Sequence, residues 1–449
     1  MSELDTVIRG GTVLTLCPVH DTREVRADLR VRGARIIAMG RAARRGPPAR
    51  VLPAEGCVVI PGFVQAHVHL CQTLFRGTAD GLPLLPWLQR RIWPFEAAHD
   101  ARSTRASAQL GAAELLRSGT TTVLDMGSVH HHEHVFEALL ASGLRAFSGK
   151  AMMDRGRGVP AGLRETLRDS LRASDALRDA WHGAADGRLR YAYAPRFVLS
   201  CSEALLRGVS ERATTSAPSM PTLMHTHAAE HAEERAEVRR RLGRDDIDAL
   251  AAHGITGPRA LLAHGVQLRP AEIKRLARAG TRVVHCPSAN MKLGSGIAPL
   301  RAFREHGLAV ALGADGAPCN NRLDVFTEMR QAALLSCARE RDALATSAAH
   351  ALRLATIDGA RALGLDGDVG TLEIGKRADI TVVHISALHH EPGGDALSRL
   401  VYATQASDVR HVMVDGRVLV ERGELRSLDE ATVLTDARRE LRKLMSRAS

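Results

Sequence analysis

Two histidines one residue apart are the first residues in this sequence that could bind a metal. They are His67 and His69, and they follow an apolar run that ends near Pro61 and Gly62. On a strand, side chains at positions i and i+2 point to the same face, so both imidazoles can reach one ion at about 2.0–2.1 Å. Histidine is also a common half-buried polar residue, so the pair indicates a metal site only together with further donors.

Three later apolar runs also lead into residues that bind metals or move protons. One ends with His225 and His227 and is followed by Glu230, and the others end near His264 and Asp315. Imidazole and carboxylate groups are zinc ligands and proton carriers. His225 and His227 would share one face of a strand, so spacing alone does not decide which of them is the ligand.

The elements that must bring these residues together are eight short apolar runs, each followed by a segment of helical length. Strands that alternate with helices predict parallel βα units, and eight units over about 260 residues match the ~250 residues of a closed (β/α)₈ (TIM) barrel. Active sites of this α/β fold lie at the carboxyl ends of the strands. The predicted strands are Cys57–Phe63, Thr120–Met126, Arg145–Met153, Leu189–Phe197, Thr222–His227, Ala260–Val266, Thr281–Cys286 and Leu308–Gly313.

Both ends of the chain have a different texture from the barrel region. Residues 1–56 alternate apolar and polar positions with glycine turns between them, and the same pattern returns within residues 367–428. Period-two alternation is typical of short antiparallel strands, so the two ends are predicted to pair into one small β-sandwich. The barrel is then predicted to span residues 57–366, and residues 429–449 are predicted to form a charged terminal helix.

Five segments resemble, in order and spacing, the signature of the amidohydrolase superfamily. They are PGFVQAHVHL, HTHAAE, LLAHGV, HCPSANMKLGSG and LGADGAPCNN. The resemblance covers nearly the whole chain. It is strongest to the branch of methylthioadenosine/S-adenosylhomocysteine deaminases, 5'-deoxyadenosine deaminases, guanine deaminases and triazine hydrolases.

The resemblance implies a metal centre with assigned roles. The ligands would be His67, His69, His227 and Asp315, and Glu230 and His264 would handle protons; His227 is preferred to His225 because the family has its catalytic Glu three residues after the ligand. The predicted fourth strand lacks the lysine that bridges two metals in some relatives, so one Zn²⁺ is expected, with Fe²⁺ or Mn²⁺ as alternatives. Such an ion lowers the pKa of its water toward about 7.

In this scheme the reaction is the hydrolytic removal of an amino group from a purine. Asp315 would accept one proton from water, Glu230 would pass another to the ring nitrogen, and His264 would orient the attacking oxygen. Ammonia would leave and a ring carbonyl would remain. The sequence has no PCxxC, so the combination of HxE with PCxxC that marks the unrelated zinc cytidine deaminases is missing.

The residues that would select the substrate point in two directions. Gln72 and Arg196 resemble positions that hold the purine edge in guanine deaminases, although they could simply bond to backbone, whereas the segment around Trp87 resembles adenosine-type deaminases. Leu85 replaces a ribose-binding Glu of the methylthioadenosine enzymes, so Lys150 or the histidines at 130–132 and 134 could meet a sugar instead. An adenosine-type substrate is predicted, with guanine or a chloro- or aminotriazine as alternatives.

Composition favours a soluble globular protein. The formal charge is +11, but only five of the 61 basic residues are lysine, and the arginines are scattered without a basic block and interleaved aromatics. This pattern predicts solvated faces rather than a nucleic-acid groove. Seven cysteines without a CxxC pair, no signal segment and no long apolar run predict a cytoplasmic protein that does not contact membranes. We expect the protein to be a homo-oligomer. We expect its binding partner to be a small aminopurine substrate.

Overall fold

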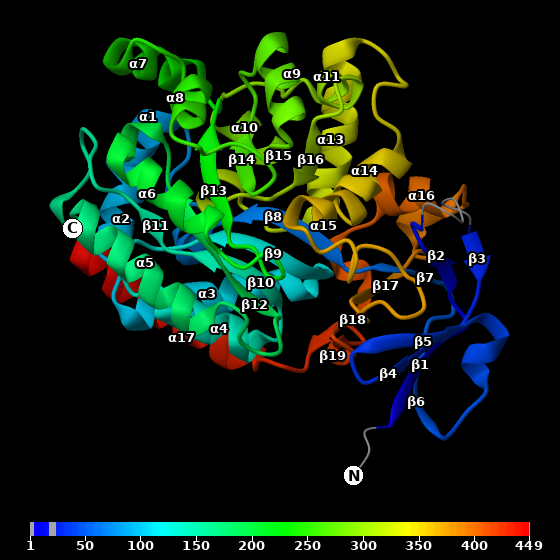
Figure 1. Cartoon of the computed structure of the whole chain (residues 1–449). Helices are drawn as coiled ribbons and strands as arrows, with labels where there is room; N and C mark the ends of the chain where they lie inside the picture. The colour runs from blue at the N-terminus through cyan, green and yellow to red at the C-terminus, as the bar shows by residue number, and fades with distance from the viewer. Residues whose placement is uncertain (1–3, 18–23, 449) are drawn as a thin grey trace.

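The computed structural model describes residues 4–17 and 24–448, and its centre is a parallel barrel (Figure 1). Eight strands are hydrogen-bonded in the order of the chain, and the backbone N–H of Asp315 donates to the carbonyl of His67 at 3.0 Å, which joins the last strand region to the first. The predicted (β/α)₈ fold is therefore confirmed. The barrel strands are β8 (Phe63–Val68), β9 (Thr120–Met126), β10 (Arg145–Gly149), β12 (Leu189–Pro195), β13 (Leu223–Ala228), β14 (Ala260–His264), β15 (Arg282–His285) and β16 (Ala309–Leu312).

Helices surround the barrel and connect its strands. Side-chain caps begin several of them: Asp100, Thr166 and Ser202 each accept a hydrogen bond from a backbone N–H of the first turn. The longer helices are α3 (Ala101–Arg117), α4 (Glu133–Ser142), α5 (Leu167–Trp181), α6 (Glu203–Thr214), α7 (Ala232–Leu242), α8 (Asp246–Ala252), α9 (Pro270–Ala279), α13 (Val325–Glu340), α14 (Ala348–Leu354) and α15 (Ile357–Leu363). Short ones are α1 (Leu84–Trp87), α2 (Trp93–Ala97), α10 (Pro287–Lys292), α11 (Leu300–Glu305), α12 (Ala317–Asn320) and α16 (Ala396–Ser398).

Two further sheets are built from both ends of the chain, as predicted. One has the order β5-β4-β1-β6, and the other has the order β20-β19-β18-β17-β7-β2-β3. Apolar side chains from both sheets share one small core, which makes the pair a sandwich. The strands are β1 (Asp5–Arg9), β2 (Thr12–Leu14), β3 (Glu24–Arg26), β4 (Leu29–Arg32), β5 (Arg35–Met39), β6 (Ala49–Pro53), β7 (Cys57–Pro61), β17 (Ile380–His384), β18 (Val409–Val414), β19 (Arg417–Glu421) and β20 (Glu424–Leu425).

The boundary between sandwich and barrel differs from the predicted one. Residues 57–61 form β7, which pairs with β17 and β2 of the sandwich, and the barrel begins at Phe63 rather than at Cys57. Gly62 lies at the transition, where a Cβ would be 2.2 Å from the side chain of Thr121. The apolar run is continuous across both strands, so its hydrophobicity did not reveal the crossing from one sheet to the other.

Two contacts attach the outer parts of the chain to the barrel. The buried guanidinium of Arg145 on β10 forms hydrogen bonds of 3.0 Å with both carboxylate oxygens of Asp379, next to β17. The terminal helix α17 (Glu430–Ala448) packs on α3, and its Arg447 bonds to Ala98 and Ser103 (Figure 1). Within residues 4–17 and 24–448, every helix is too short or too polar to cross a membrane.

Candidate active site

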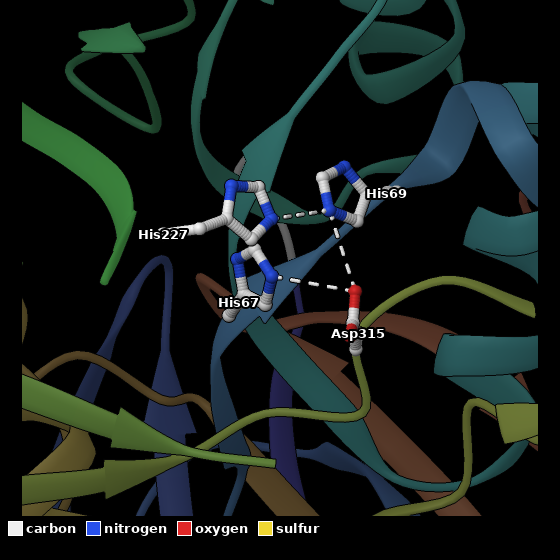
Figure 2. A group of neighbouring side chains, drawn as sticks. All are labelled: His67, His69, His227 and Asp315. Atoms are coloured by element: carbon white, nitrogen blue, oxygen red, sulfur yellow. Dashed lines mark hydrogen bonds and ion pairs between the residues drawn. The ribbon is translucent and has the colours of Figure 1, made fainter. Parts of the chain in front are cut away.

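Four side chains converge at the carboxyl ends of the barrel strands (Figure 2). His67 and His69 extend from the end of β8, His227 from β13 and Asp315 from the loop after β16. One ligand atom from each lies within 4.8 Å of the others. Asp315 Oδ1 is 3.3 Å from the Nε2 atoms of both His67 and His69. Three strands that are distant in the sequence thus contribute one compact donor group.

The hydrogen bonds around these histidines leave their Nε2 atoms facing one another. Nδ1 of His69 bonds to the carbonyl of Met126, and Nδ1 of His227 bonds to the carbonyl of Arg196, both at 2.7 Å. Burial lowers the pKa of His227 to about 3 and the pKa of His69 well below its usual value, so both rings are neutral. The Nδ1 atoms then carry the protons, and two Nε2 lone pairs face each other at 3.2 Å.

A cation fits this donor set. The Nε2 of His67 is buried and has no hydrogen-bond partner among the described residues, and the other two Nε2 atoms present lone pairs to the same point. Repulsion among these lone pairs is removed when they share one positive ion, and the carboxylate of Asp315 adds a negative charge. Three imidazoles and one carboxylate suit Zn²⁺ and also Fe²⁺ or Mn²⁺.

The structure brings His227, and not His225, into the donor group. The Nε2 of His225 instead lies 2.9 Å from Nδ1 of His67. When His67 presents Nε2 to the donor group, its Nδ1–H donates to His225, and this bond fixes the ring orientation and tautomer of His67. Alternation along β13 allowed either His225 or His227 to be the ligand. The structure decides between them, because His225 bonds to His67 across the barrel instead of joining the donor group.

Replacing His225 by alanine should weaken metal binding without removing a ligand. Loss of a hydrogen bond to a ligating histidine typically lowers metal affinity about 10–100-fold. Competition with a chromophoric chelator measures this change directly. His253→Ala, which removes a buried histidine outside this group, is the matched control. Equal zinc affinity of His225→Ala and the unaltered protein would contradict the orienting role.

Glu230 and His264 lie beside the donor group and could move protons. Glu230 Oε2 is 3.5 Å from His264 Nε2, which in turn is 3.8 Å from Asp315 Oδ2, and Asn290 Oδ1 holds Nδ1 of His264 at 2.9 Å. Burial, together with the carboxylates of Glu234 and Asp315, raises the pKa of Glu230 well above its usual range. Although burial opposes ionisation of Asp315, His264, His69 and His227 lower its pKa. The Glu230 carboxyl therefore tends to hold a proton, and the Asp315 carboxylate is available to accept one.

A small cavity opens onto these groups. Its wall contains Gln72, Trp87 and Arg196, three residues that the sequence singled out as substrate contacts. Apolar side chains make up much of the remainder, which suits a flat ring. The wall consists of His69, Gln72, Leu84, Trp87, Leu88, Arg196, Phe197, His227, Glu230, His264, Leu293 and Asp315.

Glu96 is a site residue that the sequence analysis missed. Its carboxylate accepts hydrogen bonds from Gln72 Nε2 at 2.8 Å and from Arg196 Nη1 at 2.5 Å, and its side chain is 3% exposed. This arrangement leaves Gln72 Oε1 buried without a partner among the described residues. The carboxylate thus holds both polar residues of the wall. A lone acid after the apolar segment Ile92–Phe95 was the only sequence signal.

Lys150 and the histidine run do not reach the cavity wall. Lys150 is buried, and its Nζ bonds to Glu165 Oε2 at 2.5 Å and to the carbonyl of Ala151, outside the cavity wall. Its contact with a sugar therefore stays a prediction. His132 is buried against Ser148, whereas the other histidines of the run lie nearer the surface. Glu165 thus binds the ammonium of Lys150, and Ser148 binds Nε2 of His132.

The fold and the site define a barrel hydrolase whose strand ends carry side chains that could bind a metal ion. A profile of the Amidohydrolase family matches residues 58–419. The chain belongs to the amidohydrolase family, as the sequence resemblance predicted.

Several similar proteins are deaminases of adenosine-type molecules. The chain is 40% identical over 395 residues to a 5-methylthioadenosine/S-adenosylhomocysteine deaminase of Halobacterium salinarum, covering 88% of this chain and 89% of that protein. It is 38% identical over 409 residues to a 5'-deoxyadenosine deaminase of Methanothermobacter thermautotrophicus, covering 91% and 92%. A zinc-bound adenosine deaminase structure from Xanthomonas campestris superposes with a TM-score of 0.91 at 33% identity, covering 99% of each chain.

Proposed function

We propose that this protein is a metal-dependent aminohydrolase that removes ammonia from an aminopurine, with an adenosine-type molecule as its substrate. The observation that carries the proposal is the convergence of three neutral imidazole nitrogens and Asp315 beside Glu230 in one cavity. Membership of the amidohydrolase family and the deaminases among its relatives support the same reaction. The products are the corresponding oxopurine and ammonia.

We assign one divalent ion, Zn²⁺, to His67, His69, His227 and Asp315. When bound, such an ion activates water for attack at neutral pH by lowering its pKa. The fourth barrel strand, β12, carries arginine and tyrosine but no lysine, so it offers no amine to bridge a second ion. One ion is therefore the stoichiometry that the chain supports.

The residues of the chain divide the proton transfers between them. Asp315 uses Oδ1 in the donor group, and its Oδ2 faces His264, so Oδ2 is free to take a proton from the attacking water. Glu230, whose pKa is raised, donates its proton to the ring nitrogen beside the amino-bearing carbon. His264, held by Asn290, orients the water. The water oxygen bonds to carbon, and Asp315 passes the proton taken from water to the amino group. The carbon–nitrogen bond then breaks and ammonia leaves, while the remaining hydroxyl proton returns to Glu230 as the ring carbonyl forms.

A substrate panel tests the proposal. The zinc-loaded protein is incubated with 5'-deoxyadenosine, methylthioadenosine and S-adenosylhomocysteine, and ammonia release is followed together with loss of the adenine ultraviolet band. We expect turnover of at least one of them. Guanine and an aminotriazine form the second arm, because Gln72 and Arg196 also suit a base with polar edges. No ammonia from the adenosine arm, with metal content verified, would overturn the adenosine-type assignment.

A further inference from the structure

Glu230 follows a backbone turn in which Ala229 has an unfavourable conformation. Ala229 has φ of +50°, in the left-handed region where a residue with a Cβ is destabilised. This turn lies between His227 of the donor group and the proton-handling Glu230, so its geometry sets how far apart their side chains lie. Such a turn persists only where surrounding groups hold it.

Groups from other parts of the chain hold the turn on every side. Asp246 Oδ2 accepts the Ala229 N–H at 2.5 Å, and the N–H of Gln267 donates to the Ala229 carbonyl at 2.8 Å. The carboxylate of Glu234 lies beside the backbone of Glu230 and His231. The N–H and the carbonyl of Ala229 are thus both bound, one by a carboxylate and the other by the backbone of a neighbouring loop.

Arg235 links the two groups that hold Ala229. Its Nε lies 3.0 Å from Asp246 Oδ1, and its Nη1 donates to the Gln267 carbonyl at 2.5 Å. Glu272 binds the far side of the same guanidinium, through both of its carboxylate oxygens. Asp246, Arg235 and Glu272 are only 1%, 2% and 3% exposed.

Burying these charges is unfavourable unless each is paired. Water alone could bind the backbone groups of a turn at the surface, without any buried charge. The pairs join helices α7, α8 and α9 directly beneath the turn. Of the three residues, Asp246 bonds to the backbone of Ala229, and none of the three lines the cavity.

We propose that Asp246, oriented by Arg235, is a positioning residue for Glu230: it holds the left-handed turn at Ala229 and so keeps the proton-handling carboxyl beside His264. The proposal rests on the function proposed above, because its effect on rate acts through Glu230. Its structural part, the hydrogen bond by which Asp246 clamps the Ala229 N–H, can be measured without turnover.

The test compares Asp246→Ala with Asp246→Asn in the zinc-loaded, full-length protein. Alanine removes the acceptor of the Ala229 N–H, whereas asparagine retains an oxygen there. We expect Asp246→Ala to lower kcat about 100-fold, as small misplacements of catalytic groups do, with KM and zinc content nearly unchanged. We expect Asp246→Asn to recover most of kcat. Asp248→Ala, on the same helix and with its side chain 40% exposed, is the matched control and should behave as the unaltered protein.

Hydrogen exchange of residues 228–235 provides the second readout. Faster exchange in Asp246→Ala than in Asp248→Ala is expected, whether or not a substrate has been found, so failure of the proposed function is distinguishable from failure of the clamp. If Asp246→Ala does not fold, Asp246→Asn and Ala229→Gly are compared instead. Ala229→Gly relieves the strain at the turn and should reduce the rate loss when added to Asp246→Ala. Unchanged exchange, or unchanged kcat at full zinc loading, would overturn the proposal.

Discussion

Replacement of Glu230 by glutamine should lower kcat about 10²–10⁴-fold while the protein still binds zinc. Glutamine has nearly the same shape but no proton to donate, and Glu230 lies outside the group of four donors. The Glu230 carboxyl, whose pKa is raised by burial and by Glu234, is the proton source nearest to His264. Ammonia release at saturating substrate gives kcat, and elemental analysis gives the zinc content.

A matched control separates loss of this proton from a general change of charge. Glu233 lies three residues further along, exposed in the first turn of α7 and outside the cavity wall. Glu233→Gln should therefore retain full kcat. Full activity of Glu230→Gln, or loss of zinc from it, would contradict the role assigned to this carboxyl.

The parts of the site that could be predicted follow from the symmetry of the fold. In a parallel barrel every strand ends on the same side, so an ionisable residue at each strand end is brought to one place. His67, His69, His227 and Asp315 could be grouped in this way although 248 positions separate the first from the last. The family resemblance supported the same grouping.

What escaped prediction are partners that meet only through tertiary packing. Glu96 binds Arg196 across 100 residues, and nothing in its local sequence indicates this pairing. Lys150 follows the end of β10, as a site residue would, yet Glu165 binds its ammonium away from the cavity wall. A strand end fixes where a backbone lies, whereas the nearest opposite charge decides where a long side chain points.

Asp246 shows the same limit for the backbone. Its position at the start of α8 reads as an ordinary helix-start acid, and only the structure reveals the Ala229 N–H at its second oxygen. The positive φ of Ala229 was equally hidden, since alanine gives no signal of a left-handed turn. Both features lie around a predicted catalytic residue, where local preferences are often overridden.

Removal of the metal should abolish turnover and lower thermal stability together. Without a cation, the Nε2 lone pairs of His69 and His227 remain 3.2 Å apart in a buried site. An ion present at 100–1,000 times its dissociation constant stabilises the folded state by about 2.7–4.1 kcal/mol. Chelator-treated protein should therefore unfold several degrees lower than zinc-loaded protein in a calorimetric scan, and added Zn²⁺ should restore both Tm and ammonia release.

The variant Asp315→Asn distinguishes a bound ion from a general salt effect. It keeps the shape of the side chain but removes the negative charge that faces His67 and His69. Zinc should then raise its Tm less than it raises that of the unaltered protein, and Mg²⁺, which prefers oxygen ligands in an octahedral array, should raise neither. Metal-free protein that retained full turnover would contradict the proposed chemistry. No side chain in the cavity wall is positioned to replace a cation that faces three neutral imidazoles and one carboxylate at once.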